Sequence, residues 1–228
     1  MTTRSVPILF IGGSGLTAWI WDDVRRHLGD RPLDRVAARP ASGEQASLEE
    51  YVDAAIGSAP AGKFLIVAHS SGGVIGAEVA RRVSDRVKGF LAVSAVIPAP
   101  GGSFIGAMPI PNRWILGVMM RMTSTRPPAS VIRRGLAYGL PEEITRRIIE
   151  EFVPESDRLY RDRTGTGPLE VESGYVFTTA DREFPLKLQQ QSAQRLGARW
   201  TSELSTGHLP MIEDPQEMAE VVIRYLER

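Results

Sequence analysis

Three residues far apart in the sequence have the types that nucleophilic catalysis needs. Ser70 lies in the run Ala68-His-Ser-Ser-Gly72, between an apolar segment and a segment with helical spacing. Such a strand–turn–helix elbow exposes the serine hydroxyl, and small neighbours tolerate the tight turn. A serine attacks a carbonyl carbon when a base takes its proton and N–H groups stabilise the oxyanion that forms. The alternative is that Ser70 only caps the following helix.

The sequence offers three histidines as candidate bases, His27, His69 and His208. His27 lies in a polar, arginine-rich segment, which is typical of a solvated helix. His69 precedes Ser70 directly, and on an elbow its side chain is expected to point away from the hydroxyl and to pack in the core. His208 lies in a loop before the last helix, from which it can reach the serine. We therefore predict His208 as the base, and a loop histidine without a catalytic role is the alternative.

Asp181 follows the apolar segment 175–180 and is the predicted acid. Its carboxylate is expected to hold the tautomer of the histidine and to stabilise the imidazolium. The order Ser70, Asp181, His208 is the one in which folds with a serine elbow supply their three catalytic residues. The strand expected to end near Val93 carries no acid, which removes the commonest other location. Helix capping or a salt bridge is the alternative role.

The segments around these residues alternate between short apolar strands and helices. Strands are expected over 6–11, 35–38, 63–68, 89–94, 174–178 and near 199–200, and helices over 19–28, 48–56, 71–83 and 215–226. Asp214, just before Pro215, is the expected cap of the final helix. Continuous apolar strands that alternate with helices predict an α/β fold with a mostly parallel sheet covered by helices on both faces.

The middle of the chain breaks this alternation, because Pro, Met and Arg become frequent there. Short helices are expected over 112–122, 129–138 and 141–152. We interpret residues 98–168 as a helical cap insertion that lies over the carboxyl edge of the sheet. Residues 1–97 and 169–228 then form the core.

Composition limits the partners of the protein. The 228 residues include 27 Lys plus Arg, 27 Asp plus Glu and no cysteine. The balanced charge does not favour nucleic acid as a partner, and the lack of cysteine excludes disulfides, thiolate metal sites and a cysteine nucleophile. The apolar run 8–11 is too short to cross a membrane, and no cleavage site follows it. We expect a cytoplasmic protein, not bound to membranes, that acts on a small molecule, and the sequence leaves its oligomeric state open.

Four segments together resemble the α/β-hydrolase superfamily, in particular the branch of plant methylesterases and hydroxynitrile lyases with their small bacterial relatives. These segments are 10–21, 68–73, 175–185 and 207–215. The resemblance extends over nearly the whole chain. It implies an α/β-hydrolase fold with a catalytic triad of Ser70, Asp181 and His208, and neither a cofactor nor a metal.

The resemblance also implies an oxyanion hole made of backbone N–H groups. The first loop of the family usually reads His-Gly-x, and its third residue donates one N–H group. This chain has Gly12-Gly13-Ser14 there, without the histidine, and its elbow begins with Ala68 where glycine is usual. Ser14 and Ser71 are therefore the expected backbone donors.

Two residue positions separate hydrolases from lyases in this branch. The lyases resemble one another in having a threonine at one position and a lysine directly after the catalytic histidine. This chain has Gly13 at the first of these positions and Leu209 at the second. A lyase that releases cyanide needs a positive charge near the leaving group. We therefore expect a serine hydrolase that cleaves an ester or lactone of a small hydrophobic substrate through an acyl-enzyme. Gly13, Trp114 and Met119 are expected to contact this substrate.

Two other functions are left open. One is a lyase, a tailoring enzyme or a ligand-binding protein on the same fold. The other is an NADP-dependent reductase, because 13–18 fits the Gly-x-Gly-x-x-Gly/Ala dinucleotide fingerprint and Arg35 or Arg39 could accept a 2′-phosphate. Such reductases resemble a family that carries the pattern Tyr-x-x-x-Lys. In this chain no tyrosine is followed by a lysine four residues later.

Overall fold

A parallel sheet forms the centre of the protein. The computed structural model describes residues 6–110 and 125–228. Within them, six strands pair in the order β2-β1-β3-β4-β5-β6, and every pair is parallel. The strands are β1 (Ile8–Ile11), β2 (Arg35–Val36), β3 (Phe64–His69), β4 (Val87–Val93), β5 (Ser173–Thr178) and β6 (Trp200–Leu204). This confirms the predicted α/β class and the parallel sheet.

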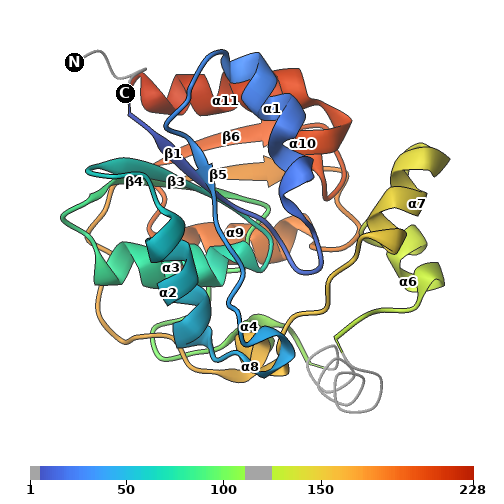
Figure 1. The fold of residues 1–228 in the computed structure, drawn as a ribbon, viewed down its shortest axis with the longest axis horizontal. Helices are drawn as coiled ribbons and strands as arrows, with labels where there is room; N and C mark the ends of the chain where they lie inside the picture. Colours follow the sequence, from blue (N-terminus) through green and yellow to red (C-terminus); the bar gives the residue numbers. More distant parts are fainter. Residues whose placement is uncertain (1–5, 111–124) are drawn as a thin grey trace.

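Helices cover both faces of the sheet (Figure 1). One face carries α1 (Asp22–Leu28) and α11 (Pro215–Leu226), and the other carries α2 (Leu48–Ser58), α3 (Gly72–Arg82) and α9 (Leu186–Leu196). Successive side chains of β1 belong to opposite faces: Ile8 and Phe10 pack in one hydrophobic cluster, and Leu9 and Ile11 pack in the other. Because both faces are buried, the central strands β1 and β3 read as continuous apolar runs.

Most predicted elements are present, with shifted ends. The final helix has the predicted bounds, and the Asp214 side chain caps it by accepting the N–H of Glu217 at 3.0 Å. The helix expected over 19–28 begins as a 3-10 turn, η2 (Ala18–Trp21), before α1. Helix α9 was not predicted, because its buried face includes the polar residues Gln189 and Ser192. Two short turns complete this part of the chain, η3 (Gly43–Gln45) and α10 (Pro210–Glu213).

The segment 98–168 contributes short helices and none of the strands named above. Its described helices are α4 (Phe104–Ala107), α6 (Ala129–Arg134), α7 (Glu142–Glu150) and α8 (Asp157–Arg161). Helices α6 and α7 are shorter than the sequence predicts, and the helix expected over 112–122 lies outside the described residues. The division into a core and a cap stays a prediction. In the ranges that the structure describes, no helix has the length and apolar character needed to cross a membrane.

The sheet brings five distant loops to one edge. Because all the strands are parallel, their carboxyl ends meet there, which is where open α/β sheets bind ligands. Residues 12–15 follow β1, Ser70 follows β3 and Ser94 follows β4. Asp181 and His208 follow β5 and β6. The topology thus collects residues from positions 12 to 208 of the chain at a single place.

Candidate active site

Ser70 occupies the turn between β3 and α3 in a strained backbone conformation. Its φ angle is 54°, in the left-handed region that residues other than glycine rarely adopt. Its carbonyl accepts the N–H of Val96 at 3.0 Å, and its own N–H donates to Val93 at 3.3 Å, so the turn is tied to the end of β4. Ser71 is the N-cap residue of α3 and makes no side-chain cap bond. The alternative role of Ser70 as a helix cap is therefore not seen.

The elbow accommodates alanine where glycine is usual. The side chain of Ala68 is fully buried between β3 and α3. The helix residue opposite it is Gly76, and a Cβ atom added to this glycine would lie 3.1 Å from the Cβ of Ala68. Because Gly76 has no Cβ atom, the methyl group of Ala68 has room between the strand and the helix. The departure from the usual pattern is thus compensated one turn into the helix.

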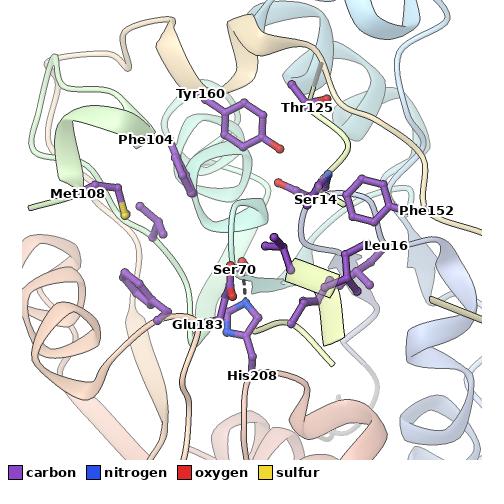
Figure 2. Close-up of a pocket in the computed structure, with 16 residues that line it drawn as sticks. Ser14, Leu16, Ser70, Phe104, Met108, Thr125, Phe152, Tyr160, Glu183 and His208 are labelled. Carbon is purple, nitrogen blue, oxygen red and sulfur yellow. Dashed lines mark hydrogen bonds between the residues drawn. The ribbon is translucent and has the colours of Figure 1, made fainter. Parts of the chain in front are cut away.

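His208 connects Ser70 to Asp181 through hydrogen bonds. Its Nε2 lies 3.0 Å from the Oγ of Ser70 (Figure 2). Its Nδ1 lies 2.7 Å from Oδ2 of Asp181. Because the carboxylate can only accept, the Nδ1–H group donates to Asp181, and Nε2 is left to accept the serine proton. The three predicted catalytic residues therefore lie within the distances that proton transfer requires.

Charge and burial act in opposite directions on this pair. Burial alone raises the pKa of Asp181, but the hydrogen bond and charge of His208 outweigh burial and lower the pKa to about 2. Burial lowers the pKa of His208, and the hydrogen bond and charge of Asp181 overcome it and raise the pKa above the usual 6.5. Asp181 therefore stays ionised over the whole range in which His208 titrates.

The Asp181 carboxylate is held by donors on both oxygens. Oδ1 accepts the backbone N–H groups of Glu183 and Phe184, both at 2.8 Å. Oδ2 accepts the hydroxyls of Ser94 at 2.6 Å and Thr178 at 3.0 Å, in addition to the imidazole. With every contact made by a donor, the carboxylate has one defined orientation toward the histidine.

Ser94 and Gln189 are site residues that the sequence did not reveal. Ser94 has a φ angle of 40°, and its hydroxyl lies 3.4 Å from Nδ1 of His208 as well as beside Asp181. The buried amide of Gln189 bonds to the backbone of Thr178 and to the carbonyl of Phe184, at the two ends of the loop that carries Asp181. For Ser94, the available signal in the sequence was that the strand expected to end near Val93 carries no acid. Gln189 had no signal, because its α9 helix was not predicted.

His69 is buried and supports the backbone of His208. Its Nε2–H donates to the carbonyl of His208 at 2.8 Å, and the two rings lie 4.7 Å apart. Burial and the charge of His208 lower the pKa of His69 to about 3. His69 is thus neutral near pH 7, and it acts on the loop conformation of His208 and not on the serine proton.

The two predicted oxyanion donors are joined through their side chains. The hydroxyl of Ser14 donates to that of Ser71 at 2.6 Å, so the first loop and the start of α3 have a defined separation. The N–H of Ser71 lies where a helix begins and its first N–H groups lack helical partners. Gly13 lies against the elbow, where an added Cβ would approach the Cβ of Ser70 to 2.8 Å. It is not among the described residues that line the cavity.

A largely apolar cavity of about 360 Å³ opens above the serine. Figure 2 shows Ser70 and His208 at its floor and the Tyr160 hydroxyl directed toward Ser14. Its apolar lining comes mostly from the segment 98–168 and includes Phe104, Met108, Val131, Ile132, Leu136 and Phe152. Among the described lining residues, Glu183 is the only carboxylate and there is no Lys or Arg. Trp114 and Met119 lie outside the described residues.

The family assignment follows from a comparison with known proteins. A model of the alpha/beta hydrolase family matches residues 8–221. The chain belongs to the α/β-hydrolase family. The usual dinucleotide-binding sheet has the order 3-2-1-4-5-6, whereas β1 of this hydrolase lies between β2 and β3. The reductase alternative therefore loses its structural basis.

Relatives of this hydrolase match it over nearly their whole length. A protein of Oryza sativa subsp. indica named "Probable esterase PIR7A" is 26% identical over 251 residues, with 95% of each chain covered. An extracellular α/β-hydrolase from a Paenibacillus species superposes with a TM-score of 0.82 at 19% identity, over 96% of this chain and 98% of that one. Methylesterase MES16 from Arabidopsis gives a TM-score of 0.77 at 16% identity, over 97% and 98%. The two structural likenesses show the shared fold.

Proposed function

We propose that this α/β-hydrolase is a serine esterase that cleaves carboxylic esters or lactones of small hydrophobic substrates. The observation that carries the proposal is the hydrogen-bonded series from Ser70 through His208 to Asp181, which begins at the floor of an apolar cavity. The esterase name of the relative from Oryza sativa supports the same reaction type. The predicted cytoplasmic location stays a prediction.

The mechanism is a two-step acyl transfer. His208 Nε2 accepts the Ser70 proton as Oγ attacks the carbonyl carbon, and the oxyanion is stabilised by the N–H groups of Ser14 and Ser71. His208 then donates this proton to the leaving alcohol, and an acyl-enzyme remains on Oγ. A water molecule gives a proton to His208 and attacks the acyl carbon, after which Ser70 is restored and the acid is released.

The cavity favours neutral substrates. Its lining is mainly aliphatic and aromatic, and the carboxylate of Glu183 lies at its exposed rim. A substrate with its own carboxylate would lose hydration in the cavity and meet no Lys or Arg among the described lining residues. We therefore expect neutral esters to react faster than esters that carry an additional negative charge.

A hydrolase is favoured over a cyanide-releasing lyase. The residue after His208 is Leu209, which is fully buried and is not among the cavity lining. The part of the cavity wall that the structure describes has no cationic side chain to stabilise a leaving cyanide. Hydrolysis needs no such charge, because His208 can protonate the leaving alcohol.

A series of nitrophenyl esters tests the proposed reaction. Acetate, butyrate and hexanoate esters should be cleaved with a rapid burst of about one nitrophenolate per enzyme, followed by slower turnover of the acyl-enzyme. The palmitate ester should react more slowly, because the chain exceeds what a cavity of about 360 Å³ can enclose. Enzyme pretreated with a fluorophosphonate is the control and should show neither phase. Absence of turnover with every ester in the untreated enzyme would contradict the proposal.

The pH dependence should show a single rise above pH 6.5. His208 must be neutral to accept the serine proton, so activity falls as the pH drops below its pKa and approaches its full value above it. Since Asp181 raises this pKa, the midpoint of kcat/KM for nitrophenyl acetate should lie higher than the ordinary histidine value of 6.5. Stopped-flow rates between pH 5 and pH 9 give this midpoint. A flat profile from pH 5 to pH 8 would exclude His208 as the base.

A further inference from the structure

The loop after β1 needs a support that its own sequence lacks. It reads Gly12-Gly-Ser-Gly15, without the histidine that usually braces it in this family. A second cavity of about 280 Å³ lies beside it, lined by Gly12, Gly13, Arg39, Tyr51 and Glu155 among others. Gly13 packs against His69 and Ser70 of the elbow, but neither glycine has a side chain that could reach into this cavity and fix the backbone that carries the Ser14 N–H.

A segment just after α7 contacts this loop at Gly15. The Gly15 N–H donates to Oε1 of Glu155 at 3.3 Å, and the Gly15 carbonyl accepts the N–H of Val153 at 3.1 Å. Gly15 has a φ angle of 75°, and an added Cβ would lie 2.0 Å from the Phe152 ring. Both backbone polar groups and the open face of Gly15 are thus held by residues 152–155.

Glu155 is itself held in position by two distant side chains. It is buried, with 6% of its surface exposed. Arg39 forms an ion pair with Oε1 at 2.7 Å, and the hydroxyl of Tyr51 donates to Oε2 at 2.7 Å. Arg39 also donates to the carbonyls of Leu16 at 3.0 Å and Val153 at 3.2 Å. A buried carboxylate is costly unless it is paired, and here its charge is matched by Arg39.

We propose that Glu155 is a positioning residue of the oxyanion hole. It anchors Gly15, while the hydroxyl bond between Ser14 and Ser71 anchors the other side of the same turn. Ser14 lies between these anchors, so its N–H stays directed toward the oxyanion without the customary histidine. The support comes from the segment 98–168, which also lines the cavity. This inference rests on the proposed esterase function, because the oxyanion exists only during acyl transfer.

The test compares Glu155→Ala with the conservative variant Glu155→Gln, in which the amide oxygen can still accept the Gly15 N–H. We expect Glu155→Ala to lower kcat for nitrophenyl butyrate about 100-fold, with KM changed less than about threefold, because a displaced donor acts on the transition state. Glu155→Gln should recover most of this loss. The pH midpoint should not move, since His208 and Asp181 are untouched. Glu220→Gln, on the exposed face of α11, is the matched control and should behave as the wild type.

A trifluoromethyl ketone, which forms an oxyanion on the serine, gives the decisive readout. Its affinity should fall in Glu155→Ala by the same factor as kcat/KM. A purely structural role would lower the melting temperature and leave kcat and this affinity unchanged, which would overturn the inference.

If circular dichroism shows that Glu155→Ala does not fold, Tyr51→Phe replaces it. We then expect about a tenfold loss of kcat, and an unchanged kcat would overturn the inference. A wild type that neither hydrolyses esters nor binds the ketone overturns the proposed function, and with it the inference; an active wild type with unaffected variants overturns the inference alone.

Discussion

Replacing Ser70 with alanine is expected to lower kcat by a factor of about 10⁶ and to abolish labelling by a fluorophosphonate. The substitution removes the Oγ atom that lies 3.0 Å from Nε2 of His208, and the Ser94 hydroxyl cannot replace it because it lies beside Nδ1, the nitrogen that faces Asp181. The elbow should persist, because its backbone bonds to Val93 and Val96 do not involve the hydroxyl. Intact-protein mass spectrometry after labelling measures the modification directly.

The matched control is Ser84→Ala, in the exposed turn between α3 and β4. This variant should label and turn over as the wild type does. Equal labelling of Ser70→Ala and the wild type would refute the assignment of Ser70 as the nucleophile. Labelling without turnover in the wild type would instead indicate a reactive serine in a ligand-binding protein.

Replacing Asp181 with asparagine is expected to lower kcat by a factor of about 10⁴. Oδ1 accepts two backbone N–H groups, which cannot become acceptors, so the amide oxygen must take this position. The amide NH₂ group then occupies the position of Oδ2 and faces Nδ1 of His208. A donor there selects the tautomer with its proton on Nε2, which cannot accept the proton of Ser70.

The residual activity of Asp181→Asn should also have a shifted pH profile. Asp181 raises the pKa of His208, and burial lowers it. With the carboxylate gone, burial dominates, and the midpoint should move to lower pH than in the wild type. Asp214→Asn, at the exposed N-cap of α11, is the control, because asparagine caps helices as well as aspartate does. A loss of kcat below tenfold in Asp181→Asn would contradict the role of Asp181 in holding the tautomer.

The sequence was sufficient for the predictions that depend on local patterns. A run of apolar residues from 63 to 68 predicts a buried strand because both faces of a parallel sheet are covered. Asp214 before Pro215 predicts the start of the last helix for an equally local reason. The helix α9 was missed because its buried side uses Gln189 and Ser192, whose burial depends on partners elsewhere in the chain.

Single-residue chemistry also allowed the choice among three histidines. The loop around His208 and its place in the chain favour this residue as the base, and the position of His69 directly before the serine argues against His69. The structure places His208 beside Ser70 and gives His69 a separate contact, to the carbonyl of His208. Which atoms meet depends on the turn geometry, and that geometry is strained in a way that serine itself does not favour.

By itself, the sequence predicts the type of chemistry, because Ser70, Asp181 and His208 each follow a strand, and the carboxyl ends of parallel strands share one edge of a sheet. Only the tertiary structure decided how these groups are oriented. The Ser94 hydroxyl beside Asp181 and the Glu155 carboxylate beside Gly15 join residues separated by 87 and 140 positions. Such contacts leave no local pattern, since a buried polar side chain is chosen by the unpaired group that it must satisfy across the fold.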